Sequence, residues 1–216
     1  MKIDSRTVGA FQENTYLVVD EDTGEAIVID PGDEGDEIIS MIEAGGGTLR
    51  SIWLTHAHLD HIGAVSALRR RYGSVPVYLH PLDRAVYDAA SLFAESYGIP
   101  FEQPDAPDAE LAHGDVAWIG NLNFDVIHVP GHSPGHVAFY GHGILLGGDV
   151  LFAGSIGRTD LPMANPEHMQ QSLRALAALP PDTIVYPGHG ETTTIGQELS
   201  TNPFLNGLAN VKRNAD

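Results

Sequence analysis

The stretch WLTHAHLDHIGA, residues 53–64, places three histidines and an aspartate within six consecutive positions. A metal site, a chance run on a polar surface or a buried hydrogen-bonded cluster would each contain such a run. In an extended segment, His56 and His58 point to the same side and can bind one ion together. Asp60 and His61 follow at a predicted strand-to-helix turn, where the chain changes direction and can present ligands to a second ion.

Three later segments also carry a polar side chain just beyond an apolar strand. VIHVPGH ends at His132, LLGGD ends at Asp149 and IVYPGHG contains His189. Because the carboxyl ends of strands gather along one rim of a sheet, we expect these side chains to lie together. The expected cluster consists of His56, His58, Asp60, His61, His132, Asp149 and His189. Such nitrogen and oxygen donors suit zinc, manganese or iron.

The density of imidazoles favours a metal site over the other two interpretations. Packing several imidazoles together without a ligand is costly whenever they protonate. A carboxylate shared by two ions, here Asp149, would neutralise charge and hold the ions about 3.5–4 Å apart. Five histidines outside the cluster are interpreted as surface or hydrogen-bonded residues: His80, His113, His128, His142 and His168.

The chain as a whole predicts a mixed α/β fold. Short apolar runs rich in β-branched residues alternate with amphipathic segments, so helices should cover sheets. TYLVVD and AIVIDPGD read as a hairpin, and DEIISMIEAGGG, HIGAVSALRRRYG, LDRAVYDAASLFAESYG and NPEHMQQSLRALAAL read as helices. In the first of these helices Ile38, Ile39 and Ile42 should share one face, and in the last, which Asn165 should cap, Met169, Leu173 and Leu176 should be buried. A boundary near residue 115 is conceivable, but nothing there resembles a linker. We therefore predict a single domain over residues 1–216, built from two similar halves.

Charge and composition exclude several classes of partner. The chain has no cysteine and a formal net charge of -18, a field that repels nucleic-acid phosphates and anionic lipid. We therefore expect neither nucleic acid nor a membrane as a partner. No apolar run approaches the ~18 residues that span a bilayer, and the start lacks a secretory signal pattern, so a cytoplasmic location is expected. The oligomeric state is not indicated.

The motif T-H-A-H-L-D-H resembles the H-x-H-x-D-H signature of the metallo-β-lactamase fold superfamily. P-G-H-S-P-G-H, G-G-D and P-G-H-G match its remaining motifs in order, from about Gly9 to Pro203. The resemblance implies a four-layer αββα sandwich with a dinuclear site on one edge. It places His56, His58 and His132 on the first metal, and Asp60, His61 and His189 on the second. Asp149 would bridge the two metals, and Asp30 of IDPG would support the ligands without binding a metal.

Within this superfamily the chain is most similar to the hydroxyacylglutathione hydrolase (glyoxalase II) group. The commonest β-lactamase class has a cysteine at the position of Asp149, nucleases add a binding domain or arm, and flavin-linked diiron members replace the second histidine by glutamate. GGDVLFAGSIGRTDLP is similar to the glyoxalase II segment, in which Arg158 would contact the glutathione moiety. Alternatively, Arg158 pairs with Asp160 and only orders the loop. The longer enzymes of the group append a C-terminal helical domain, and with its end at NPFLNGLANVKRNAD this sequence resembles the short, single-domain branch.

The expected activity is therefore hydrolysis of an acyl thioester, with S-D-lactoylglutathione as the natural candidate. A hydroxide bridging two Zn²⁺ ions would attack the thioester carbon, while Asp60 orients the nucleophile or takes its proton. Iron, manganese or a mixed pair are alternatives to zinc. The competing interpretations are a glutathione persulfide dioxygenase with one iron on His56, His132 and Asp149, a lactone hydrolase, and a metal-binding module without turnover.

Overall fold

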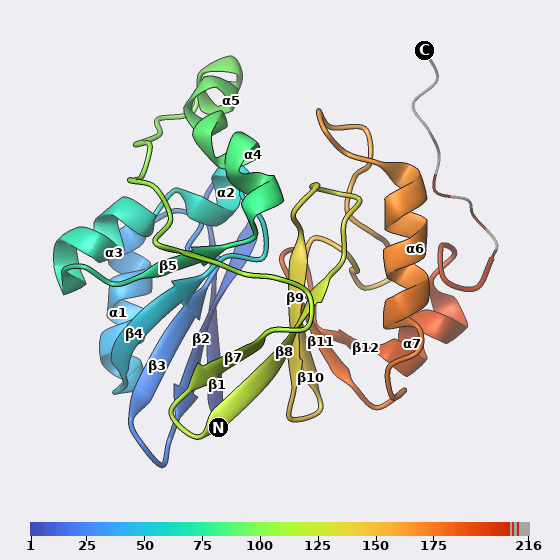
Figure 1. Ribbon diagram of the computed structural model, residues 1–216, viewed down its shortest axis with the longest axis horizontal. Coiled ribbons are helices and arrows are strands. Elements are labelled where there is room, and N and C mark those ends of the chain that lie inside the picture. The colour runs from blue at the N-terminus through green and yellow to red at the C-terminus, as the bar shows by residue number, and fades with distance from the viewer. Residues whose placement is uncertain (208, 210, 212–216) are drawn as a thin grey trace.

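Two six-stranded sheets form the centre of the protein, which a computed structural model describes over residues 1–207, 209 and 211. The first sheet has the order β1-β2-β3-β4-β5-β6 and the second the order β12-β11-β10-β9-β8-β7. In Figure 1 the helices from the first half of the chain lie outside one sheet, and α6 and α7 lie outside the other. This is the four-layer αββα arrangement that the sequence predicts.

The first sheet is mixed. Its strands are β1 (Lys2–Val8), β2 (Glu13–Asp20), β3 (Glu25–Ile29), β4 (Thr48–Trp53), β5 (Val77–Leu79) and β6 (Ala109–Glu110). The predicted hairpin is β2 and β3, which pair antiparallel, whereas β3, β4, β5 and β6 pair in parallel. Parallel strands end at the same edge, so the segments after β3, β4 and β5 reach one rim together.

The second sheet contains the other candidate segments. Its strands are β7 (Val116–Ile119), β8 (Leu122–His128), β9 (Val137–Gly141), β10 (Ile144–Gly148), β11 (Ile184–Pro187) and β12 (Thr193–Thr194). Strands β10 and β11 are parallel, so the segments that follow them leave the sheet at the same end. β9 runs antiparallel to β8 and β10, which brings the β8–β9 loop to that end as well.

Three apolar layers hold the sandwich together, as alternation along the strands requires. In β2, Leu17 and Val19 face the core under the helices of the first sheet, whereas Tyr16 and Val18 face the core between the sheets. Between the sheets, Trp53 packs against Phe124 and Phe139. Because both faces of β2 are covered, all eight of its residues are buried.

The third layer lies between the second sheet and the C-terminal helices α6 (Pro166–Leu176) and α7 (Ile195–Thr201). The predicted cap of α6 is confirmed, since the Asn165 side chain accepts hydrogen bonds from the backbone N–H groups of Glu167 and His168. The predicted buried face of α6 is confirmed as well: Met169, Leu173 and Leu176.

Two of the expected helices are interrupted. The first helix, α1 (Gly35–Gly45), is continuous, but HIGAVSALRRRYG contains parts of two helices, α2 (Leu59–Ile62) and α3 (Val65–Tyr72). LDRAVYDAASLFAESYG divides into the 3-10 turn η1 (Pro81–Asp83) and the helices α4 (Arg84–Asp88) and α5 (Ala90–Tyr97). The breaks let α2 carry the ligand segment and let α4 and α5 lie above the rim (Figure 1). The described chain contains no helix with the length and apolar character that crossing a bilayer requires.

Candidate metal centre

All seven residues of the expected cluster lie at one edge of the sandwich. His56, His58, Asp60 and His61 follow β4, His132 lies in the β8–β9 loop, and Asp149 and His189 follow β10 and β11. Asp30, at the end of β3, lies directly behind them. The strand ends therefore bring these side chains together as the sequence analysis expects.

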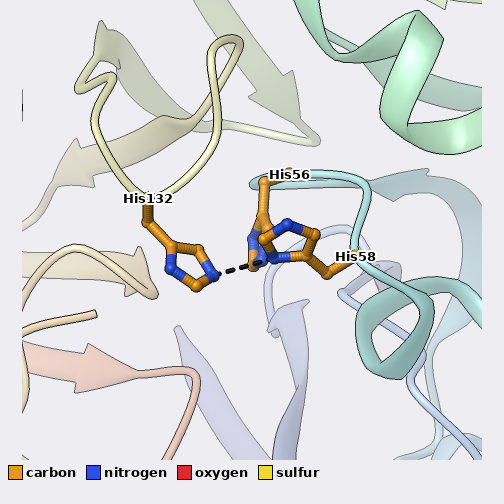
Figure 2. A group of neighbouring side chains, drawn as sticks. All are labelled: His56, His58 and His132. Atoms are coloured by element: carbon orange, nitrogen blue, oxygen red, sulfur yellow. Dashed lines mark hydrogen bonds between the residues drawn. The ribbon is translucent and has the colours of Figure 1, made fainter. Parts of the chain in front are cut away.

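The donors form two groups. His56, His58 and His132 offer ring nitrogens that all lie within 4.8 Å of one another, and Figure 2 shows the three rings converging from two loops. His58 Nδ1 and His132 Nε2 are 2.8 Å apart. Asp60, His61 and His189 form a second group within the same 4.8 Å limit.

Asp149 lies between the two groups. One carboxylate oxygen, Oδ2, is 3.4 Å from His132 Nε2 in the first group and 3.4 Å from His189 Nε2 in the second. The other oxygen, Oδ1, is 3.5 Å from His61 Nε2 and has no hydrogen-bond partner. This is the position that a carboxylate shared by two ions requires.

The imidazoles are oriented as metal ligands usually are, with one ring nitrogen bonded to the protein and the other presented inward. His132 Nδ1 donates to the Arg158 carbonyl at 2.8 Å, and His189 Nδ1 donates to the Phe11 carbonyl at 3.1 Å. The inward nitrogens of His56 and His61, both Nε2, are buried without a hydrogen-bond partner. Buried polar atoms without a partner are rare, and a metal ion would satisfy them.

Asp30 orients the first segment from behind. Its Oδ1 accepts the backbone N–H of Thr55 at 2.7 Å, and its Oδ2 accepts the Thr55 hydroxyl at 2.6 Å. Oδ2 also lies 3.1 Å from His61 Nδ1, and the Thr55 hydroxyl oxygen lies 3.0 Å from His56 Nδ1. Asp30 adopts φ 49°, in the left-handed region, which turns the chain sharply after β3. One carboxylate thus fixes the ring orientation of two neighbouring histidines.

The charges divide between the two groups. Burial and the neighbouring histidines lower the pKa of His56, and burial with His132 lowers the pKa of His58 to about 3. Burial also disfavours the charged form of His189, but hydrogen bonds to Asp149 and Asp60 raise its pKa to about 10. His56 and His58 are therefore held as neutral imidazoles, the form that binds metal ions, whereas His189 is paired with the carboxylates of Asp60 and Asp149.

Two buried residues of the site received no role in the sequence analysis. The His136 ring stacks on His56, and its Nε2 accepts the backbone N–H of Asp149 at 2.9 Å. Glu13 is fully buried, with Oε1 3.9 Å from His61 Nδ1, and burial raises the pKa of its carboxyl group. His136 closes the quoted motif P-G-H-S-P-G-H, which was the available signal, whereas Glu13 has no signal in its local sequence.

Asp83 is a third residue that the sequence analysis did not single out. Its Oδ1 accepts hydrogen bonds from the Ser133 hydroxyl and the Gly135 backbone N–H. Its Oδ2 accepts the backbone N–H of Ala57 at 2.9 Å. Asp83 is fully buried and joins the loop between His56 and His58 to the loop that contains His132.

Arg158 makes the pair that the sequence analysis gave as an alternative to substrate binding. Its Nε and Nη2 donate to the two carboxylate oxygens of Asp160, each at 2.8 Å. The Arg158 side chain is 64% exposed and also lines the cavity above the cluster. Contact with a substrate therefore remains a prediction for Arg158.

The histidines outside the cluster make ordinary hydrogen bonds. His113 Nδ1 accepts the backbone N–H of His128, and His142 Nε2 accepts that of Asn123. His80 caps η1 by accepting the Leu82 N–H, and its ring stacks on His128 at 4.4 Å between centroids. His168 lies in the first turn of α6, where its N–H is capped by Asn165.

We expect His80 to make the protein less stable in acid. Burial, followed by the neighbouring His128, lowers its pKa from 6.5 to about 4. Between these values the unfolded chain binds more protons, so the stabilisation from neutral His80 is complete above pH 6.5 and is lost as the pH falls toward 4. His80→Asn keeps the cap without titrating. The quantity to follow is the free energy of unfolding of the wild type minus that of the variant. It should fall by about 2 kcal/mol as the pH is lowered from 6.5 to 4, measured by denaturant titrations at matched metal content. A constant difference would contradict this assignment.

The family model of the metallo-beta-lactamase superfamily matches residues 8–189. Hydroxyacylglutathione hydrolase GloC of Haemophilus influenzae is 39% identical over 210 residues, which cover 95% of this chain and 99% of that protein. A crystal structure of TTHA1623 in a di-iron-bound form superposes with a TM-score of 0.87 at 46% identity, covering 94% of this chain and 100% of that one.

Two further solved structures are similar. BLEG-1, a B3 metallo-beta-lactamase, is 40% identical with a TM-score of 0.88, covering 95% of this chain and 100% of that one. ETHE1 from Myxococcus xanthus is 30% identical with a TM-score of 0.80, covering 96% of this chain and 85% of that one. Together with the family match and the paired donor groups, these likenesses show that the chain belongs to the metallo-beta-lactamase superfamily and is a metal-dependent hydrolase with a dinuclear site.

Proposed function

We propose that this hydrolase cleaves acyl thioesters at the cluster of His56, His58, Asp60, His61, His132, Asp149 and His189, with S-D-lactoylglutathione as the first substrate to test. The observation that carries the proposal is the position of Asp149, whose carboxylate contacts donors of both groups. The Haemophilus influenzae relative, named as a hydroxyacylglutathione hydrolase and similar over nearly its full length, supports this class of substrate.

A cavity gives a substrate access to the donors. It has a volume of about 340 Å³, and its floor includes His58, Asp60, His132, Asp149 and His189. A volume of this size falls in the range of sites for small molecules. The carbonyl carbon of a bound thioester can therefore lie next to the shared carboxylate while the rest of the substrate fills the cavity.

In this mechanism His56, His58 and His132 would hold one metal ion and Asp60, His61 and His189 the other, with Asp149 shared. When bound, two divalent ions would supply Lewis acidity and a water of lowered pKa. The Nδ1 atoms of His56, His61, His132 and His189 contact protein oxygens behind the rings, and these contacts keep the ligands in place. Asp60 lies at the edge of the cavity, 3.4 Å from His189, where it can orient the attacking water or take its proton.

The leaving group needs no dedicated acid. A thiol has a pKa of about 8.5, so its thiolate departs without prior protonation. This agrees with the lining of the cavity, where the described acidic side chains, Asp60 and Asp149, both belong to the donor groups. The site is therefore better suited to thioesters than to amides, whose nitrogen must be protonated to leave.

Removal and return of metal tests the proposal. We expect the purified protein to hydrolyse acyl thioesters, tested first with S-D-lactoylglutathione, with about two ions per chain, to lose the activity on chelation, and to regain it when zinc, iron or manganese is added. Metal analysis and thiol release measure the two quantities. Because a B3 metallo-beta-lactamase is similar, the panel includes a β-lactam and a lactone. Metal-loaded protein that releases no thiol from any thioester would refute the proposal.

A second candidate is a glutathione persulfide dioxygenase with a single iron. His132 Nε2 lies 3.4 Å from Asp149 Oδ2, and His56 Nε2 has no other partner, so two histidines and one carboxylate can face one ion. One iron per chain with oxygen uptake on a persulfide substrate would favour this candidate. Two ions with thiol release and no oxygen uptake would exclude it.

A further inference from the structure

The cavity above the donor groups has an apolar wall. Helices α4 and α5 contribute Val86, Phe93 and Tyr97, and the opposite loop contributes Leu161 and Met163. The apolar character continues to the entrance, where Tyr97 and Met163 are 53% and 54% exposed. Exposed apolar side chains grouped around a cavity are typical of a site that binds an apolar ligand.

The same cavity has little positive charge with which to bind an anionic substrate. Among the described residues that line it, Arg158 is the one lysine or arginine, and Asp160 occupies its guanidinium with two hydrogen bonds. Asp160 leaves Nη1 of Arg158 unused, but its carboxylate already balances the guanidinium charge, so a substrate carboxylate would form an exposed ion pair with little net gain. Arg84, next to the lining residue Ala85, is likewise paired with Asp88. The net charge of -18 also repels an anionic substrate on approach.

We propose that this enzyme selects thioesters with an apolar aliphatic or aromatic acyl group, attached to a thiol carrier without carboxylates. This inference rests on the proposed thioester hydrolysis and narrows it: the acyl chain packs against Phe93 and Val86, and the thioester carbon lies at Asp149. Glutathione carries two carboxylates, and the one arginine or lysine on the described wall is Arg158, whose charge Asp160 already balances.

The dependence of kcat/KM on the length of the acyl group tests whether the apolar wall binds that group. With the metal-loaded protein and the acetyl, butanoyl and hexanoyl thioesters of the neutral thiol N-acetylcysteamine, kcat/KM should rise about 4-fold for each added methylene. The hexanoyl thioester of glutathione should be no better than that of N-acetylcysteamine. A flat dependence on chain length, or a preference of about 10-fold or more for the glutathione carrier, would overturn the inference and leave thioester hydrolysis standing.

A positive charge placed on the apolar wall should shift the choice of thiol carrier toward glutathione. Phe93 lines the cavity, whereas its neighbour Leu92, on the same helix, is 68% exposed and is not part of the lining. Phe93→Lys should lower kcat/KM for the hexanoyl N-acetylcysteamine thioester and raise the glutathione-to-N-acetylcysteamine ratio about 10-fold. Leu92→Lys adds the same charge to α5 and should leave the ratio unchanged. Equal ratios in both variants would contradict the assigned wall.

Asp160→Asn tests the choice of thiol carrier without adding a charge to the wall. It keeps the size of the side chain and removes the charge that occupies Arg158. The carrier ratio should then shift several-fold toward glutathione, because the guanidinium becomes available to a substrate carboxylate. An unchanged ratio would show that Arg158 does not govern the choice of carrier.

Binding without turnover separates this inference from the proposed function. The ketone analogues of the hexanoyl and acetyl thioesters, in which a methylene replaces sulfur, cannot be hydrolysed. Calorimetry on the metal-loaded protein should show the hexanoyl analogue binding more tightly than the acetyl analogue by the same ~4-fold per methylene. If no thioester is hydrolysed but this gradient is present, the proposed function fails and the apolar site stands. If the gradient is absent, the apolar site fails.

Discussion

Replacing Asp149 with asparagine is expected to lower kcat/KM for thioester hydrolysis by about 1000-fold or more and to reduce the metal content below two ions per chain. Asp149 is 5% exposed and contacts His132, His61 and His189. Asparagine keeps the volume but removes the negative charge that the two ions would share, and several kcal/mol of charge stabilisation correspond to this factor. Steady-state kinetics and metal analysis on the same preparation measure both effects.

The control is an exposed aspartate that does not belong to the donor groups. Asp125 is an exposed residue of β8, so Asp125→Asn makes the same chemical change without touching the cluster. It should retain wild-type turnover and metal content. Wild-type turnover in Asp149→Asn, with two ions still bound, would show that the carboxylate is not shared and would remove the basis of the proposed mechanism.

The donor groups could be predicted because their signal is local. Each candidate follows an apolar strand, and the edge where strands end is dictated by the layered fold. The buried faces of α1 and α6 follow from their periodicity in the same way, although in α1 the residue buried with Ile38 and Ile42 is Met41 and not Ile39. The fold class and the collection of His and Asp at one rim were therefore accessible without coordinates.

The supporting residues could not be predicted because their roles depend on contacts between distant segments. Strand β1 was missed since its sequence, KIDSRTV, is mostly polar and lies at a sheet edge with one buried residue. Glu13 reads as a polar residue before a strand, and only the fold brings its carboxylate beneath His61. Asp83 lies in what reads as an amphipathic helix, where an aspartate normally faces solvent.

Asp83 shows most clearly what the tertiary structure adds. The loop after β4 belongs to the first sheet and the β8–β9 loop belongs to the second, so no local interaction sets the distance between His56 and His132. Asp83 supplies that interaction by accepting hydrogen bonds from Ala57 in one loop and from Ser133 and Gly135 in the other. A carboxylate that accepts three hydrogen bonds in a buried position orders both loops before any ion binds.

We therefore expect Asp83→Asn to lower the free energy of unfolding by about 2–3 kcal/mol and to weaken metal binding by about 10–100-fold. An amide offers one acceptor oxygen where the carboxylate offers two, and its NH₂ group would face a backbone or hydroxyl donor. Denaturant titration measures the first effect, and competition with a chelator of known affinity measures the second. The loss of metal affinity is the informative readout, since a residue with only a structural role would change stability alone.

A matched control lies five residues further on. Asp88 is at the end of α4, exposed, and paired with Arg84, so Asp88→Asn changes the same functional group without touching either ligand loop. It should alter the free energy of unfolding by less than about 1 kcal/mol and leave metal affinity unchanged. If Asp83→Asn is destabilised yet binds metal as tightly as Asp88→Asn, the two loops are aligned by the ions themselves, and Asp83 contributes to folding but not to the geometry of the site.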